Sequence, residues 1–249
     1  MKSSEHHKMA SVEDSLWWYM CLHKKVIDTL KNYNTKQDAQ ILDAGCGTGG
    51  MLKKLQAANY KDINGIDISK TAIEYTRNLG FAVDELNLSE VETKYSKNSL
   101  DVIISLDVLC YFTSMKAEKV LQSLSNILKK DGIVILNLPA YKSFEGMHDI
   151  SVGLVGRTTR KEIEQQLKNT GFKITEHHHW PFILMPLIYS TRLSQRVKMW
   201  LFKDTEISSD IDLPPGWINK LFYTITCFEE KFGALRFFGS SIFVVAKKI

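Results

Sequence analysis

The sequence predicts an α/β protein with a doubly wound, mostly parallel sheet. Residues 41–44 read as a short apolar strand that runs into a glycine-rich turn at 45–50. A second apolar strand, 63–68, carries an acid near its end, about twenty residues further on. Residues 100–105 are almost continuously apolar, which is typical of a strand buried on both faces. Because strand and helix patterns alternate along the chain, we expect helices to cover both faces of one sheet.

The other elements follow from hydrophobic periodicity and from residues that begin or end helices. Residues 1 to about 12 are polar and are expected to be frayed, and an amphipathic helix is predicted over 12–30. Ser69 and Thr159 each precede a helical pattern as N-caps. The remaining predicted elements are strand 40–44, helix 50–58, helix 69–78, strand 81–88, helix 116–128, strand 133–138 after a turn at 130–132, helix 159–168, strand 172–177 and strand 241–246.

A connection of about sixty residues separates the last two strands, and connections of that length are usually structured or functional. It holds two helix candidates, 184–202 and 217–231, with a break at 214–216. The predicted organisation is therefore an N-terminal tail and lid helix, then a main domain with a helical insertion; the boundaries are 1–37, 38–249 and about 180–238.

The glycine turn and the acid Asp67 indicate a nucleoside ligand. Glycines let the backbone approach a ligand closely, and Asp67 is placed to accept hydrogen bonds from both ribose hydroxyls. The turn fits the dinucleotide pattern and also the S-adenosylmethionine (SAM) pattern, in which an acid, here Asp43, precedes it. A carboxylate there would repel a pyrophosphate but favour the amino group of SAM. We therefore expect SAM, with a dinucleotide as the alternative.

These motifs resemble the class I SAM-dependent methyltransferases over roughly residues 38–180 and the final strand. The matching stretches are 42–49, 65–69, 99–105 and 128–135. The flanks resemble a looser branch of the family, which begins with a tryptophan pair (here 16–19) and often acts on small molecules, glycans or lipids. The resemblance implies a Rossmann-like, seven-stranded sheet whose last strand inserts antiparallel beside the sixth.

The resemblance implies SAM as cofactor and S-adenosylhomocysteine as product. Asn87 lies where relatives place an acid or amide near adenine, with Asp84 as its rival. The predicted cofactor-binding residues are Asp43, Gly45, Cys46, Gly47, Gly49, Asp67, Ile68, Asn87, Leu88, Ser105, Leu106, Trp18 and Tyr19.

The tryptophan pair reads either as core packing or as a lid over the cofactor. Trp17 and Trp18 project about 100° apart on a helix, so they are not expected to be equally buried, which favours a lid. Relatives usually carry an arginine soon after the pair. Here His23 or Lys24 would have to replace it.

Methyl transfer from a sulfonium needs mainly alignment, and a general base helps when the acceptor is a hydroxyl. The candidate catalytic residues are His148, which precedes Asp149, and Tyr111. A loop histidine and a packed aromatic are the alternatives. His177, His178 and His179 alternate between the faces of a strand, so no metal site is expected.

Composition excludes several classes. A net charge of +4 and a pI of about 8.7 are too weakly basic to indicate nucleic acid. The longest apolar run, 180–189, is too short to span a bilayer, and the N-terminus lacks a signal-peptide pattern. The four cysteines show no C-x-x-C spacing, which fits free thiols in a cytoplasmic protein.

The sequence thus predicts a cytoplasmic SAM-dependent methyltransferase for a small-molecule acceptor, with O-methylation favoured. The alternatives are a lipid-linked or glycan acceptor at a membrane surface, and a SAM-binding protein without transfer activity. The segment 182–202 mixes apolar and basic residues; it favours packing on the core or on a second subunit, with peripheral membrane contact as the alternative. The acceptor, the atom methylated and a homodimeric state stay open.

Overall fold

The computed structural model describes residues 3–202, 207, 209, 211–232 and 237–249, and it contains one seven-stranded sheet. The strands are β1 (Ile41–Ala44), β2 (Ile63–Asp67), β3 (Val83–Glu85), β4 (Leu100–Leu106), β5 (Leu128–Pro139), β6 (Phe172–Trp180) and β7 (Ser241–Lys248). Their order is β3-β2-β1-β4-β5-β7-β6. Among strands β1 to β5, neighbours in this order pair in parallel. Strand β7 runs antiparallel to both β5 and β6, as predicted.

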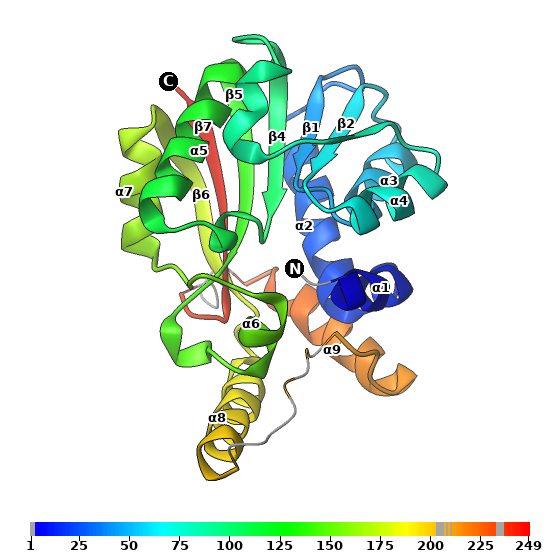
Figure 1. Cartoon of the computed structure of the whole chain (residues 1–249), viewed down its shortest axis with the longest axis vertical. Coiled ribbons are helices and arrows are strands. Elements are labelled where there is room, and N and C mark those ends of the chain that lie inside the picture. Colours follow the sequence, from blue (N-terminus) through cyan, green and yellow to red (C-terminus); the bar gives the residue numbers. More distant parts are fainter. Residues whose placement is uncertain (1–2, 203–206, 208, 210, 233–236) are drawn as a thin grey trace.

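Helices flank the sheet on both faces, so the doubly wound fold is confirmed (Figure 1). The α-helices are α1 (Ser3–Val12), α2 (Trp17–Asn32), α3 (Gly50–Ala57), α4 (Lys70–Asn78), α5 (Ser114–Ile127), α6 (Met147–Val152), α7 (Arg160–Asn169), α8 (Met185–Leu201) and α9 (Gly216–Glu229). Short 3₁₀ helices are η1 (Leu88–Thr93), η2 (Leu109–Tyr111) and η3 (Lys142–Phe144). Both predicted N-caps are confirmed. The Ser69 hydroxyl accepts a hydrogen bond from Ala72 N–H, and Thr159 forms a capping box with Glu162.

Two hydrophobic cores lie on opposite faces of the sheet. Along β4, Leu100 and Ile103 point into the core shared with α5 and α7. Val102 and Ile104 point into the core shared with α2 and α3. From Val102 to Ile104 the side chains alternate as strand geometry requires, whereas the irregularity between Leu100 and Val102 puts Leu100 on the same face as Ile103. Because both faces are buried, β4 has an almost continuously apolar sequence.

The N-terminal segment differs from the prediction. Residues 3–12 form helix α1, so the expectation of a frayed tail is wrong for them. The helix lies against α4, where His7 Nδ1 is 2.8 Å from the Tyr75 hydroxyl and the Ser3 and Thr71 hydroxyls are 2.6 Å apart. Because these contacts are long-range, the polar local sequence did not reveal them.

One further boundary differs from the prediction, and the two helices of the insertion agree with it. The expected turn at 130–132 lies within β5, where Asp131 has a left-handed φ of 65° and the pairing with β4 is irregular. In the insertion, α8 and α9 lie close to the two predicted helix ranges. No helix in the described part of the chain is long and apolar enough to cross a membrane.

The parallel strands point their carboxyl ends toward one end of the molecule. Helices α1, α6, α8 and α9 gather at that same end (Figure 1). In open α/β sheets this is the edge at which ligands bind.

Candidate active site

A cavity of about 760 Å³ opens at the carboxyl ends of the strands. Most of the residues predicted for the site line it. They are Asp43, Gly45, Cys46, Gly47, Asp67, Ile68, Asn87, Leu88, Leu106, Trp18, Tyr19, Tyr111 and His148. Gly49 and Ser105 lie behind the wall instead: Gly49 caps α3, and the Ser105 hydroxyl donates to Ala44 O at 3.0 Å.

The glycine turn needs glycine for two physical reasons. Gly45 has a φ of +91°, and a Cβ there would lie 2.3 Å from Val108 Cγ2. The turn leads directly into α3, with Gly49 at the N-cap in a left-handed conformation. The backbone of the turn therefore forms a close-fitting wall of the cavity.

Asp67 ends β2 and is held against this turn. Its Oδ2 accepts from Gly47 N–H at 2.9 Å and its Oδ1 from Ser69 N–H at 2.8 Å. A carboxylate offers about four lone-pair positions, so these two bonds fix its orientation and leave capacity for ribose hydroxyls.

The neighbouring wall of the cavity carries two apolar side chains. Ile68 is 64% exposed, and Leu88 lies on the same cavity wall. Asn87 caps η1 by accepting from Ser89 N–H at 3.0 Å. Asp84, the rival of Asn87, pairs with Lys94 and does not line the cavity.

Three carboxylates converge around the turn. Asp43 is 2% exposed, and its Oδ2 has no hydrogen-bond partner among the described residues. Burial, reinforced by Glu13 and Asp67, raises the pKa of Asp43 well above its usual range. A cationic ligand would relieve this repulsion, whereas a pyrophosphate would increase it. The electrostatics therefore favour SAM, which carries a sulfonium and an ammonium group, over a dinucleotide.

Glu13 is the site residue that sequence reasoning missed. Its Oε2 accepts from the Thr48 hydroxyl at 2.5 Å and from Gly50 N–H at 3.2 Å, at the start of α3. A Cβ on Gly50 would lie 2.3 Å from Glu13 Cδ, so Gly50 makes this approach feasible. Burial raises the pKa of Glu13 to about 7. No local pattern marks this residue, because its partner lies 35 positions away.

Of the two residues suggested in place of the family arginine, His23 lines the cavity and Lys24 does not. Lys24 pairs with Asp28 on the surface. His23 Nε2 lies 3.8 Å from Glu13 Oε1, and burial lowers the pKa of His23 to about 3. His23 is therefore neutral near pH 7, and it can donate a hydrogen bond without supplying the arginine's charge.

A polar chain links the end of β4 to the tryptophan pair. Asp107, with a left-handed φ of 56°, accepts from Asn137 Nδ2 at 3.0 and 3.1 Å. Asn137 Oδ1 in turn accepts from Trp180 Nε1 at 2.9 Å, and Trp18 stacks on Trp180. Burial raises the pKa of Asp107 to about 7. Trp18 and Asp107 therefore line the cavity, and Trp180 and Asn137 support them from behind.

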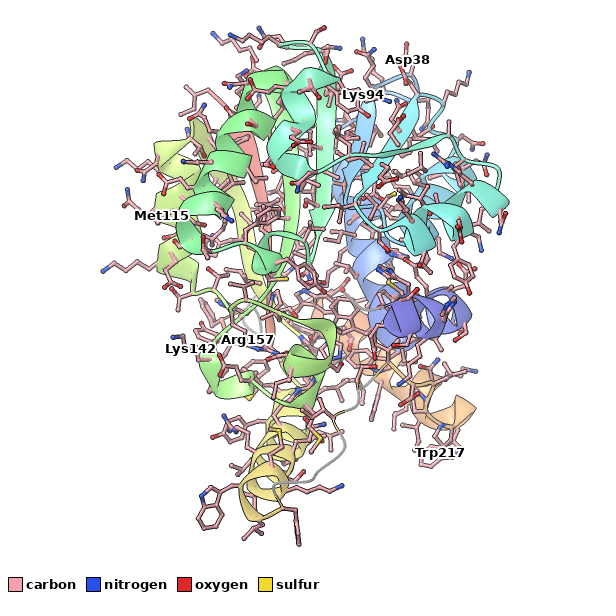
Figure 2. The ribbon with its side chains drawn as sticks, viewed as in Figure 1. Asp38, Lys94, Met115, Lys142, Arg157 and Trp217 are labelled. Atoms are coloured by element: carbon pink, nitrogen blue, oxygen red, sulfur yellow. The ribbon has the colours of Figure 1, made fainter. Side chains whose placement is uncertain are left out.

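The wall formed by η2 and α6 carries the two candidate catalytic residues, Tyr111 and His148. Burial raises the pKa of the Tyr111 hydroxyl, so it stays protonated. Asp149, which follows His148 in the sequence, has a partner of its own. Both of its oxygens accept from Arg157, at 2.8 and 2.9 Å, in a buried bidentate ion pair. Figure 2 shows Arg157 between the strand ends and α6.

The insertion completes the cavity. Side chains from α8, from α9 and from the segment between them line it, and most of them are apolar: Leu187, Ile188, Thr191, Arg192, Ile211, Asp212, Leu213, Pro214 and Phe222. Val152 and Leu154 continue this apolar wall from α6. The cavity therefore has an acidic half at the glycine turn and an apolar half at the insertion.

The three consecutive histidines lie at the end of β6. His179 is buried and stacks on Tyr141, with ring centroids 5.0 Å apart. His178 packs against Phe243. Across the described parts of the chain, no three His, Cys, Asp or Glu side chains are grouped to hold a metal ion.

The family follows from comparison with known proteins. A methyltransferase domain family matches residues 20–177, more than half of the chain. The chain therefore belongs to this family, and its fold and cofactor class are those of the SAM-dependent class I methyltransferases.

Three relatives show how far the likeness extends. Malonyl-[acyl-carrier protein] O-methyltransferase of Acetivibrio thermocellus is 32% identical over 143 residues, 52% of this chain and 47% of that protein. The chain thus spans about half the length of that relative. Carboxy-S-adenosyl-L-methionine synthase of Nautilia profundicola is 27% identical over 60% of this chain and 76% of that protein. A SAM-dependent methyltransferase structure from Archaeoglobus fulgidus superposes with a TM-score of 0.59 at 16% identity, over 91% of this chain and 94% of that one, which shows a shared fold.

Proposed function

We propose that the chain transfers the methyl group of SAM to the oxygen of a small molecule that has an apolar body. The observation that carries this proposal is the division of one cavity into an acidic half and an apolar half. SAM fits the acidic half by charge. The acceptor occupies the apolar half, where α8 and α9 exclude water and contact its hydrocarbon part.

In this proposal each cofactor-binding residue has a defined partner. Asp67 binds the ribose hydroxyls, and Ile68, Asn87 and Leu88 enclose the adenine. Asp43 and Glu13 bind the ammonium group of the methionine tail. The glycine turn supplies close backbone contact, and Trp18, Tyr19 and Leu106 shape the wall beside the sulfonium, with Ser105 supporting it from behind. Residues 1–37 then cover the cofactor, and residues 38–249 form the domain that binds it, with the insertion over the acceptor.

The proposed chemistry is an in-line displacement. An oxygen lone pair of the acceptor attacks the methyl carbon while the carbon–sulfur bond breaks, and that bonding pair stays on sulfur to give S-adenosylhomocysteine. His148 takes the proton that the acceptor hydroxyl loses, and Tyr111 donates a hydrogen bond that orients the acceptor. The name of the Acetivibrio relative, an O-methyltransferase, supports oxygen as the nucleophile.

A second candidate acceptor is a lipid-linked molecule or glycan at a membrane surface. The specific observation that favours it is the row of exposed apolar side chains on α8, the helix that also lines the acceptor half.

For either acceptor, the four free thiols support a reducing, cytoplasmic location of the protein.

Two measurements test the proposed function. Calorimetry should detect binding of SAM and S-adenosylhomocysteine and none of NAD. Incubation of cell extract with methyl-labelled SAM should label an extractable small molecule or lipid, and heat-denatured protein serves as the control. Tight NAD binding without SAM binding would overturn the cofactor assignment. SAM binding without labelling of any acceptor would leave a SAM-binding protein without transfer activity.

A further inference from the structure

Helix α8 has an outer face that is unusual for a helix in a globular domain. None of the seventeen residues of the helix, all of which the structure describes, is buried. Figure 1 shows that α8 projects from the end of the molecule at which the strands terminate. We propose that this face docks on a bilayer surface that contains anionic lipid headgroups, with the acceptor half of the cavity next to the membrane.

The exposed face is an apolar stripe. Tyr189, Leu193, Val197 and Leu201 recur at four-residue steps, and Trp200 lies between them. At about 100° per residue these side chains fall within an arc of roughly 120°. All five are exposed, and Trp200 is 80% exposed. A stripe of this width on a solvent-exposed helix is what an interfacial membrane helix presents to a bilayer.

Basic side chains lie on both sides of the stripe. At about 100° per residue, Arg196 borders the Tyr189 edge, and Lys198 lies about 60° beyond the Leu201 edge. The Arg196 guanidinium also lies over the Tyr189 ring, 5.8 Å from its centroid. Between residues 177 and 203 the sequence holds four Lys or Arg and no Asp or Glu. This local charge complements anionic headgroups, and long basic side chains reach headgroups while their stems stay in the interface.

The opposite face of α8 lies toward the cavity, so the helix lies between the cavity and the stripe. Ile188 and Arg192 line the cavity, and Gln195 Oε1 accepts from Met147 N–H at 3.1 Å. One helix therefore contacts the proposed acceptor region on one side and presents its apolar stripe on the other. Figure 2 shows Trp217 at the same end of the molecule, pointing away from the body, and it is 72% exposed.

Charge favours a bilayer over a second copy of the chain. A two-fold interface through this stripe would bring the basic flanks of two copies toward one another, because such an interface pairs the same patch with itself. An anionic lipid surface neutralises those same flanks. Docking itself is independent of the proposed function; the inference that docking delivers the acceptor rests on it.

Vesicle flotation tests the docking directly. The full chain, without SAM or acceptor, is floated with vesicles of phosphatidylcholine alone or with an equal part of phosphatidylglycerol. We expect binding to the anionic vesicles, weaker binding at high salt, and little binding to the neutral ones. Trp200→Glu should reduce the partition coefficient by at least about tenfold. Met115→Glu is the matched control, because Met115 is 79% exposed on a different side of the molecule.

A second measurement separates docking from misfolding and from dimerisation. Lipids with brominated acyl chains should quench tryptophan fluorescence in the wild-type chain and quench it less in Trp200→Phe, which keeps an aromatic ring at the exposed site. Unchanged flotation of Trp200→Glu would overturn the proposal. So would a wild-type dimer that Trp200→Glu converts to monomer while neither binds vesicles. Because the assay needs no methyl transfer, its failure leaves the proposed function standing.

Discussion

Trp18 of α2 stacks on Trp180, the last residue of β6, with ring centroids 5.4 Å apart and planes inclined by 23°. Trp180 is 1% exposed, and its indole N–H is held by Asn137. One and two turns further along α2, Leu22 and Val26 are 1% and 0% exposed in the core. The body of α2 is therefore part of the folded core, and we expect any lid movement to be confined to α1 and the turn that follows it.

Removing residues 1–12 should weaken SAM binding by at least about fivefold, or roughly 1 kcal/mol, because His6 and Met9 of α1 line the cavity beside the glycine turn. The melting temperature should fall only slightly. Removing residues 1–32 should instead prevent folding, since it deletes Leu22 and Val26. Calorimetry and thermal denaturation on the two truncated chains distinguish these outcomes. Unchanged affinity of the shorter truncation would show that α1 does not cover the cofactor.

Asp67→Ala should weaken SAM binding by roughly 1–3 kcal/mol, the range for a lost charged hydrogen-bonding partner. The change removes the proposed ribose contacts and also the acceptor of the Gly47 N–H bond. Glu85→Ala is the control, because Glu85 ends the neighbouring strand β3, is exposed, and does not line the cavity. Calorimetric affinities equal to wild type in both variants would place the ribose elsewhere.

The affinity for SAM should rise with pH up to about 7 and then level off. Burial raises the pKa of Glu13 from 4.5 to about 7, so the free protein holds a proton there in mildly acidic solution. An ammonium beside the carboxylate favours its ionised form, so binding releases that proton. The stability of the protein without SAM depends on pH in the opposite direction. Between pH 4.5 and 7 the folded chain binds more protons than the unfolded chain, so this group's contribution to stability falls as pH rises.

Glu13→Gln should flatten this pH dependence of SAM affinity, and it should reduce proton release in calorimetry in buffers of different ionisation enthalpy. Asp14→Asn is the control, because Asp14 is adjacent in sequence, exposed, and paired with Lys53 and Lys54. An identical pH profile for wild type and Glu13→Gln would exclude Glu13 from ammonium binding.

His148→Ala should lower kcat by ~10²–10⁴-fold if His148 is the general base, while the SAM dissociation constant stays unchanged. His177→Ala is the control, because it removes a partly exposed histidine of β6 that does not line the cavity. Single-turnover rates across pH separate the two variants. Normal turnover by His148→Ala would exclude His148 as the general base, and alignment of SAM with the acceptor would then be the whole mechanism.

Asp149→Ala should destabilise the fold by about 3–5 kcal/mol, because it leaves the buried guanidinium of Arg157 without its carboxylate. Arg157 also donates to Ala140 O and Ser240 O, so the loss affects the segment that precedes β7. Glu164→Ala, which breaks the exposed Arg160 pair on α7, should cost at most about 1 kcal/mol. Urea denaturation of both variants measures the difference; equal midpoints would contradict a structural role for the buried pair.

The sheet and the cofactor half of the site were predictable from sequence because they depend on local signals. The glycine turn, Asp43 and Asp67 lie at the ends of parallel strands, and such ends meet at one edge of a sheet by topology alone. The Thr159 cap was predictable for the same reason: its partner, Glu162, lies three residues away in the capping box.

The rest depends on packing between distant segments. Glu13 reaches Thr48 because α1 docks on α4, and no pattern near residue 13 encodes that docking. The ion pair between Asp149 and Arg157 joins residues eight positions apart on different segments, and no local pattern near residue 149 identifies Arg157 as the partner. The left-handed φ of Asp107 also carries no sequence signal, since aspartate adopts that conformation without glycine's help.

The position of β7 constrains how the chain is made. β6 pairs only with β7 in the described sheet, and β7 is synthesised after the whole insertion. Until β7 emerges from the ribosome, β6 has no strand to join. A nascent chain stalled just short of residue 241 would therefore present the unpaired β6 beside the already exposed apolar stripe of α8, which invites aggregation or early capture by chaperones.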